Sequence, residues 1–313
     1  MLHEISYALV PFFFSMAIGY LAGKLSHGAM PLSSINTMLV DYALPFALFL
    51  YTARMQRASF SSHLVLILLL VAVMLIPYFA SLALSRFVFK VAPSNAAVRA
   101  VTIGMPNFAA IGLPLLHSVY GDASSLTVAL AITTASVVMS PAGLILLERA
   151  RTANGIDRHN NLLAKALVTT FVKPIVIAPV IGVLVSLAGW QLPALLVQSL
   201  NIIGSTTAGL ALFSTGLILA SQPFRLDREV WVGVALSNVL QPLIAFVLVL
   251  VCALPKPVAG EAILLSAIPC GSFGILFGLS YGVQDTTAGT TLVASSVLSI
   301  VSLTATILLL SYL

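Results

Sequence analysis

The sequence predicts an all-α protein that crosses a lipid bilayer many times. Of its 313 residues, 60% are hydrophobic and 7% are charged, and the mean hydropathy is +1.11. Soluble domains carry roughly 25% charged residues, so lipid rather than water must solvate much of this surface. Long apolar runs separated by short polar breaks are the second observation. A backbone in lipid has to pair its polar groups internally, which predicts helices.

Each predicted span is an apolar run of about 20 residues, the length that crosses a hydrocarbon core roughly 30 Å thick. The shorter alternating segments of a β-barrel do not occur in the sequence. Ten such runs follow one another, at residues 5–25, 31–52, 64–88, 95–119, 125–147, 162–188, 193–220, 230–254, 258–281 and 286–310.

A polar stretch at 148–161 divides the chain into two parts, 1–147 and 162–313, with five predicted spans each. Because five is odd, a repeat across this loop would be inverted in the membrane. Short elements recur in order in the two parts, at an offset that stays between 161 and 164 residues. The matched pairs are Gly19 and Gly182, Leu48-Phe49 and Leu212-Phe213, Met105-Pro106-Asn107 and Ile268-Pro269-Cys270, and Tyr120-Gly121 and Tyr281-Gly282.

The basic residues indicate the orientation of the spans. Eleven of the 14 Lys and Arg residues fall in or beside the loops after spans 1, 3, 5 and 7. Cytoplasmic loops carry an excess of Lys and Arg, so these loops are expected in the cytoplasm and both termini outside. The net charge of +5 is therefore read as an orientation signal, and a nucleic-acid partner is not expected.

Spans 4 and 9 carry helix-breaking residues at corresponding places. Proline removes a helical hydrogen-bond donor, and glycine lets the backbone leave helical geometry. Interrupted helices at matching positions of inverted repeats indicate a transporter's substrate site. The alternative is two kinked helices with ordinary packing. The substrate-binding candidates are Pro106, Asn107 and Pro114 in span 4, and Pro269, Cys270, Gly271, Ser272 and Gly274 in span 9.

A half-helix that restarts after such a break presents unpaired N–H groups and the positive end of its dipole. This arrangement suits a carboxylate without requiring a buried Arg or Lys. The Asn107 amide can donate to an anion or accept from a protonated carboxyl group.

Other polar residues lie within or at the ends of predicted spans. Asp41 is the one acid placed deep inside a span, and it is a candidate for binding a coupling ion, either a proton or a cation. The alternative is a carboxylate that pairs across helices or reaches water. Lys173 is a candidate for attracting an anion, against the alternative of reaching the interface. Asn238 and Gln241 are expected to form hydrogen bonds between helices.

Several function classes find no support in the residues. The sequence lacks H-E-x-x-H, a Walker A lysine motif and G-x-S-x-G, so an enzyme is not expected. Cys252 and Cys270 have no metal-ligand spacing, and neither a metal nor a cofactor is predicted.

The motifs together resemble the auxin efflux carrier family of bacterial and plant transporters, along essentially the whole chain. The P-N-x-x-x-x-G-x-P-L-L pattern that begins at Pro106 is the most specific of them, and Ala178-Pro179-x-x-Gly182 looks most like bacterial malonate-type carriers. The other matching elements are Ala43-Leu44-Pro45, Pro269-x-Gly271 with Phe277 and Tyr281 downstream, and Ser295-Ser296-Val297-Leu298-Ser299.

The resemblance implies two inverted five-helix repeats, a scaffold of spans 1, 2, 6 and 7 that is often dimeric, and a mobile transport domain of spans 3–5 and 8–10. It also implies that spans 4 and 9 cross at the site for a small organic anion. Three residues depart from the pattern: Gly274 stands where plant members have proline, Asp41 where many relatives have a neutral residue, and Lys173 where many bacterial members have Asn.

The expected function is therefore secondary active transport of a malonate-, malate- or auxin-like carboxylate by an elevator mechanism. The expected location is the plasma membrane, the inner membrane in bacteria, with a homodimer as the assembly. Two alternatives stay open: a carrier of the bile-acid/sodium symporter type, and a membrane sensor that keeps the carrier fold without transporting.

Overall fold

The computed structural model describes residues 2–26, 32–54, 64–121, 124–153, 172, 174–221 and 225–311. These residues are predominantly helical, and the only β-type pairing among them is an isolated bridge between Pro106 and Cys270. Short π-helical segments, labelled η, interrupt several α-helices.

The first part of the chain contains α1 (Leu2–Leu25), α2 (Leu32–Thr37), η1 (Met38–Ala43), α3 (Leu44–Ala53), α5 (Leu64–Ala83), η2 (Leu84–Val88), α6 (Pro93–Gly104), η3 (Phe108–Gly112), α7 (Leu113–Tyr120), α8 (Ser125–Thr134), η5 (Ala135–Met139) and α9 (Ser140–Ala153). The second part contains α11 (Pro174–Ala188), α12 (Ala194–Gly204), α13 (Thr206–Ser221), α14 (Arg228–Ala235), η6 (Leu236–Leu240), α15 (Gln241–Cys252), α16 (Lys256–Ser266), α17 (Phe273–Ser280) and α18 (Thr286–Ser311).

Among the residues that the structure describes, six helical stretches are long and apolar enough to cross a bilayer, as expected of a polytopic membrane protein. They correspond to predicted spans 2, 3, 5, 7, 8 and 10 and comprise Leu32–Ala53, Leu64–Val88, Leu126–Arg151, Ala194–Ser221, Arg228–Cys252 and Thr286–Leu310. Shorter apolar helices occur at Phe13–Leu25 and Pro174–Ala188. Predicted spans 4 and 9 are each divided into two half-helices, because the chain leaves helical geometry between α6 and η3 and between α16 and α17.

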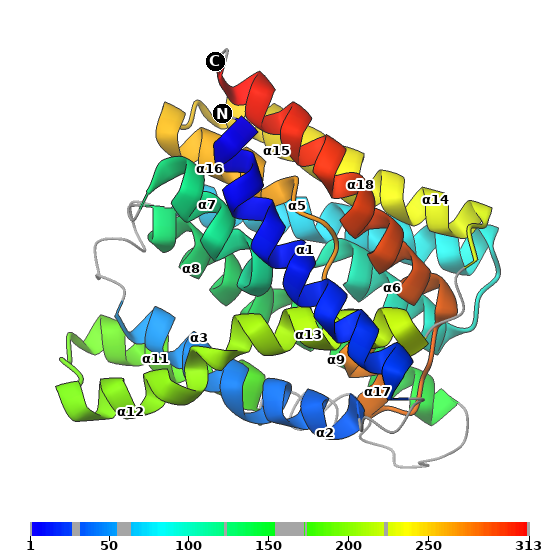
Figure 1. Ribbon diagram of the computed structural model, residues 1–313, viewed down its shortest axis with the longest axis horizontal. Helices are drawn as coiled ribbons and strands as arrows, with labels where there is room; N and C mark the ends of the chain where they lie inside the picture. Colours follow the sequence, from blue (N-terminus) through cyan, green and yellow to red (C-terminus); the bar gives the residue numbers. More distant parts are fainter. Residues whose placement is uncertain are drawn as a thin grey trace.

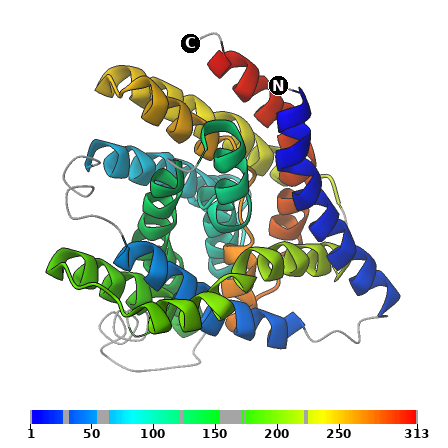
Figure 2. The same cartoon turned by 60° about the vertical axis from the view of Figure 1, so that its left-hand side comes forward.

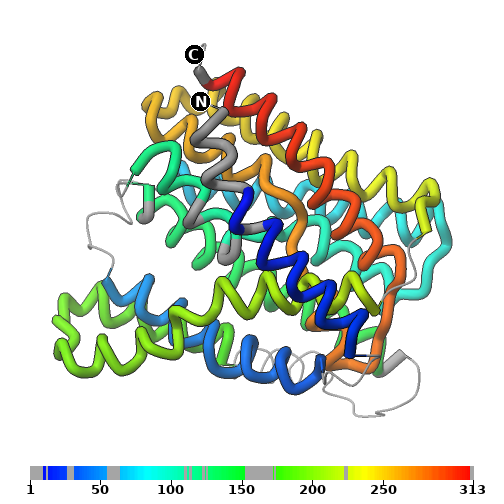
Figure 3. The backbone as a smooth tube through the Cα atoms, in the orientation of Figure 1, coloured from blue at the N-terminus to red at the C-terminus, as the bar shows by residue number. Residues whose placement is uncertain are grey.

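The helices form two groups on opposite sides of the molecule. Helices α2, α3, α11 and α12 lie together at the lower edge of Figure 1, and α14, α15 and α16 lie at the upper edge. The rotated view in Figure 2 keeps this separation. Helices α6 and α7 lie between the two groups, whereas the second broken helix runs from α16 at the upper edge to α17 near the lower edge (Figure 1). In Figure 3 the chain passes from α12 into α13 with a bend, which falls at Gly204–Ser205.

Two close helix pairs depend on glycine. Helix α1 packs against α13, and α3 packs against α11. A Cβ atom at Gly19 would lie 2.2 Å from the carbonyl oxygen of Phe213, and one at Gly182 would lie 2.7 Å from the carbonyl oxygen of Phe49. Small residues allow membrane helices to approach this closely, so any larger side chain at these two positions would separate the helices.

Candidate functional site

The candidate site is the place where the two broken helices meet. Between α6 and η3 the chain leaves helical geometry at Met105–Asn107, where Met105 is extended. Between α16 and α17 it is irregular around Pro269–Gly271. The two irregular segments run antiparallel and form the bridge between Pro106 and Cys270. The sequence-predicted residues Pro106, Asn107, Pro269, Cys270 and Gly271 are therefore brought together.

Backbone hydrogen bonds join the two breaks directly. The Asn107 N–H donates to the Pro269 carbonyl at 3.1 Å, and the Gly271 N–H donates to the Met105 carbonyl at 2.8 Å. These bonds provide partners for backbone groups that lose their helical hydrogen bonds where each helix stops. A broken helix inside a membrane requires such partners, because an unpaired backbone group in lipid is costly.

Side chains from the predicted eighth and tenth spans pair further groups at the breaks. The Gln241 amide donates to the carbonyls of Ile103 and Gly104, at 3.2 and 3.3 Å, at the end of α6. The Ser295 hydroxyl accepts from the Cys270 N–H at 3.1 Å. Asn238 bonds to Ser295 through both the carbonyl and the hydroxyl of that residue. The prediction that Asn238 and Gln241 bond between helices is confirmed.

Asn107 carries a polar atom without a partner at this crossing. The residue is 2% exposed, and its side-chain Oδ1 has no hydrogen-bond partner in the structure. A buried polar atom left unpaired costs about 1–3 kcal/mol. Such unpaired buried atoms are rare in native proteins, and one explanation for them is a ligand that completes the hydrogen bond.

The second half-helix, α17, begins beside the crossing. Ser272 is its N-cap residue, and its side chain makes no capping hydrogen bond to the first turn. Ser272 is also buried. The first N–H groups of a helix have no partner within the helix, so the start of α17 offers donors to an anion. Pro114 lies in the first turn of the other half-helix, α7.

Gly271 and Gly274 allow the half-helices to cross at short range. A Cβ atom at Gly271 would lie 2.5 Å from the Met105 carbonyl oxygen. One at Gly274 would lie 2.4 Å from the Val98 carbonyl oxygen and 2.5 Å from the Thr102 nitrogen. These neighbours are backbone atoms that cannot turn away. Both glycines therefore shape the crossing through packing.

The free space at the crossing is small. A cavity of about 10 Å³ lies there, enough for roughly one water molecule. Leu44 of α3 lines it together with Pro106 and Phe273. In this structure the cavity is thus too small for an organic solute.

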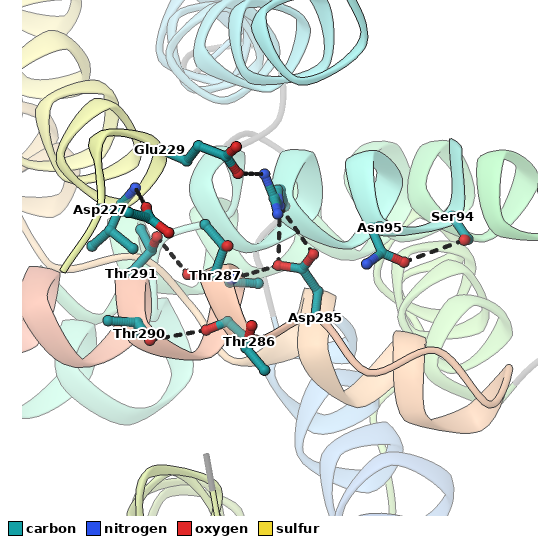
Figure 4. Close-up of polar contacts among 12 residues, drawn as sticks. Ser94, Asn95, Asp227, Glu229, Asp285, Thr286, Thr287, Thr290 and Thr291 are labelled. Atoms are coloured by element: carbon teal, nitrogen blue, oxygen red, sulfur yellow. Dashed lines mark hydrogen bonds and ion pairs between the residues drawn. The ribbon is translucent and has the colours of Figure 1, made fainter. Parts of the chain in front are cut away.

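A largely buried ion-pair cluster joins the middle of α6 to the starts of two other helices. The Arg99 side chain, on α6, donates through Nε to both carboxylate oxygens of Asp285 at 3.0 Å and through Nη1 to Glu229. Glu229 lies in the first turn of α14, and Asp285 immediately precedes α18 and accepts from the Ala288 N–H. Figure 4 shows Glu229 and Asp285 converging on the same guanidinium.

Sequence reasoning missed this cluster because it used Arg99 only as an orientation signal. The signal that could have found it is the position of Arg99 within the predicted span 4, five residues before Gly104. A charged side chain at that depth needs a partner from another helix. The cluster locks α6 to α14 and α18.

Asp41 and Glu261 differ in their surroundings. Asp41 lies in η1 and its side chain is exposed. Glu261 lies in α16, is 6% exposed and accepts a hydrogen bond from the Thr127 hydroxyl of α8. Glu261 is thus a buried acid that the sequence reading did not single out. Lys173 lies outside the described residues.

The described residues contain no group of three or more His, Cys, Asp or Glu side chains that could hold a metal ion. Within the two breaks the polar groups are backbone amides, the Asn107 carboxamide, the Ser272 hydroxyl and the Cys270 thiol. Gln241 and Ser295 add a carboxamide and a hydroxyl from neighbouring helices. Such a set can bind a small polar or anionic solute through hydrogen bonds.

Comparison with known proteins decides the family. The family described as "Membrane transport protein" matches residues 4–307. This chain belongs to that family, the auxin efflux carriers. Its members are transporters, which agrees with the expectation that the chain is not an enzyme.

Relatives of this transporter are found in bacteria and plants. It is 30% identical over 297 residues to "Uncharacterized transporter YfdV" of Escherichia coli K12, which covers 94% of this chain and 93% of the relative. It is 24% identical over 317 residues to a Rhizobium meliloti protein named "Putative malonate transporter", covering 96% and 94%. It is 22% identical over 334 residues to auxin efflux carrier component 8 of Arabidopsis thaliana, covering 90% of each chain.

Proposed function

We propose that this protein is a secondary active transporter of a small mono- or dicarboxylate, which binds where the two broken helices cross. The observation that carries the proposal is the buried, unpaired Oδ1 of Asn107 beside the uncapped start of α17. The N–H groups at the start of α17 suit a carboxylate oxygen. The Asn107 oxygen suits a hydroxyl or a protonated carboxyl group on the same solute.

The names of two relatives support a carboxylate. Malonate is a dicarboxylate, and auxin, the cargo named for the Arabidopsis relative, is a carboxylic acid. The substrate site of the proposal comprises Pro106, Asn107, Pro114, Pro269, Cys270, Gly271, Ser272 and Gly274.

Reciprocal contacts support the inverted repeat of residues 1–147 and 162–313. Gly19 approaches the carbonyl of Phe213, and Gly182 approaches the carbonyl of Phe49. The two glycines are 163 residues apart, and the two phenylalanines are 164 apart. An exchange of partners between matched positions is what a twofold relation between the halves produces. In this proposal, ten spans form the two repeats, with both termini outside the plasma membrane.

The closed crossing supports an elevator-type movement. Leu44 of α3 lines the small cavity at the crossing, and α3 belongs to the helix group that would form the scaffold. The Arg99 cluster and the Gln241 bonds instead tie α6 to α14, α15 and the start of α18. The Ser295 bond ties α18 to the second break at Cys270, so these helices can move as one body. Movement of that body past α3 would open the crossing to one side. The scaffold would also provide the contact for a homodimer.

The first experiment compares Asn107→Ala with the wild type in proteoliposomes that take up malonate, malate and indole-3-acetate. A hydrogen bond involving a charged group contributes about 1.5–3 kcal/mol, so we expect uptake to fall at least roughly tenfold. Asn201→Ala, at an exposed position of α12, is the matched control and should transport normally. Normal uptake by Asn107→Ala would remove the crossing as the site. Binding of carboxylates without uptake by the wild type would favour the sensor alternative.

A second experiment tests Asp41 as the coupling-ion group. Uptake by Asp41→Asn is measured across pH and with or without sodium. If Asp41 binds the coupling ion, the variant should lose the dependence that the wild type shows. Glu261→Gln serves as a comparison, because Glu261 is buried among the moving helices whereas Asp41 is exposed. An unchanged profile for Asp41→Asn would remove Asp41 from the mechanism, and a strict sodium requirement would favour the sodium-symporter alternative.

A further inference from the structure

A groove of about 610 Å³ opens on the surface of the protein between α5, η2, the start of α6 and α9. Its walls are mostly apolar, and two arginines, Arg86 and Arg149, line it. The remaining lining residues are Phe79, Leu82, Ala83, Phe87, Pro93, Leu146 and Ala150. The groove is separate from the crossing.

The charge of this groove has one sign. The lining contains two guanidinium groups and no acid. Glu148, the nearest acid along α9, hydrogen-bonds to Tyr281, which lies just beyond α17. Arg86 donates through Nη1 to the Val91 carbonyl at 2.6 Å, which fixes its guanidinium and leaves other N–H groups available.

The start of α6 adds further donors at the same edge. Pro93, its first residue, lines the groove. The first backbone bond there runs from the Ala96 N–H to the Ala92 carbonyl, so the N–H groups of Ser94 and Asn95 come before it. No side chain of the cap residue bonds to this turn. Two arginines and a helix start together make an anion-binding edge.

The apolar part of the groove faces the surroundings. Phe87 is 83% exposed, and Phe79 and Val88 are also exposed. In a membrane protein, exposed aromatic and aliphatic side chains on a long apolar helix contact lipid chains. Basic pockets between membrane helices bind anionic headgroups on the cytoplasmic side, where the positive-inside rule places Arg86 and Arg149.

We propose that this groove is a binding site for one anionic phospholipid. The phosphate group lies between Arg86, Arg149 and the start of α6. One acyl chain lies along Phe79, Leu82 and Ala83. The site selects anionic lipid over zwitterionic lipid because the headgroup meets two cations and no acid. The inference does not depend on the identity of the transported solute.

The test uses the purified full-length protein in detergent, titrated with phosphatidylglycerol, phosphatidylcholine and sodium phosphate. Thermal unfolding and lipid retention in native mass spectrometry are the measurements. We expect phosphatidylglycerol to be retained and to raise the unfolding temperature, and phosphatidylcholine to do so much less. In Arg86→Gln/Arg149→Gln we expect at least roughly tenfold weaker binding of phosphatidylglycerol, because each basic residue near an anionic headgroup contributes measurably.

Two further variants separate a lipid site from general charge and from a free-anion site. Arg225→Gln/Arg228→Gln removes the same number of charges from exposed positions outside the groove and should bind like the wild type. Ala83→Trp fills the acyl part of the groove without changing charge and should also weaken lipid binding. Equal loss in both double variants, unchanged binding by Ala83→Trp, equal retention of the two lipids, or a full effect from phosphate alone would each overturn the proposal.

Discussion

The first broken helix, α6–η3–α7, and the second, α16–α17, both leave helical geometry around a proline, Pro106 in one and Pro269 in the other. The first restarts through a π-helical turn, η3, whereas the second restarts directly as an α-helix. Asn107 follows the first proline and keeps a buried, unpaired oxygen. Cys270 follows the second, and its N–H is bound by Ser295. The two breaks thus share a proline but differ in the side chain that follows it.

The first half of each broken helix also carries a buried charged residue. Arg99 of α6 is paired with Glu229 and Asp285. Glu261 of α16, 162 residues later, accepts from the Thr127 hydroxyl. The first half-helix is therefore locked by ion pairs, and the second is held by a hydroxyl group. This difference predicts unequal responses to equivalent substitutions.

Arg99→Gln should give the largest effect on stability. The substitution leaves Glu229 and Asp285 close together without their cation, and removal of one partner from a buried ion pair costs about 3–5 kcal/mol. Glu261→Gln keeps the shape of the side chain and can still accept from Thr127, so it should cost much less. Thermal unfolding in detergent compares the two variants. Similar losses would show that the two half-helices are held equally.

A second substitution tests whether the loss in Arg99→Gln comes from unpaired acids. Adding Glu229→Gln to Arg99→Gln removes one of the two carboxylates. We expect it to recover part of the stability, whereas adding Asp227→Asn, on an exposed residue just before α14, should recover none. Failure of Glu229→Gln to restore any stability would assign the effect to lost packing of the arginine side chain.

Gly274→Ala and Gly112→Ala make the next comparison. The new Cβ at Gly274 would lie 2.4 and 2.5 Å from backbone atoms of α6. At Gly112 it would lie 3.1 and 3.3 Å from the side-chain ends of Leu265 and Val128. Overpacking against rigid atoms costs about 1–3 kcal/mol, so Gly274→Ala should destabilise by about that amount and Gly112→Ala by much less. Equal unfolding temperatures would show that α17 can shift away from α6.

Much of this architecture could be predicted from the sequence. Composition and run length predicted a polytopic helical protein, because lipid requires internally paired backbones. The prolines and glycines at 106, 112, 269 and 271 predicted where two helices break. The placement of Asn238 and Gln241 inside an apolar run predicted bonds between helices, and both bonds are present.

The sequence could not show which polar residues meet across the fold. Arg99 and Asp285 are 186 residues apart, and Arg99 and Glu229 are 130 apart, so their pairing depends on how three helices pack. The exposure of Asp41 could not be predicted either, because an apolar run does not reveal which of its faces is covered. The unpaired Oδ1 of Asn107 is likewise a property of three-dimensional surroundings.

Gln241→Met and Ser295→Ala give the finest comparison, since each removes the side chain that pairs one break. Gln241→Met leaves two carbonyls at the end of α6 without their side-chain donor. Ser295→Ala leaves the Cys270 N–H without its acceptor and removes one bond to Asn238. The Asn238 Oδ1 still accepts from the Ser237 hydroxyl. An unpaired buried group costs about 1–3 kcal/mol, so Gln241→Met should be the more destabilising. Amide hydrogen exchange distinguishes the two sites. Ser295→Ala should speed exchange at Cys270, while Gln241→Met should leave it slow, because the Ser295 bond remains. Fast exchange in both variants would show that the two breaks open together as one unit rather than separately.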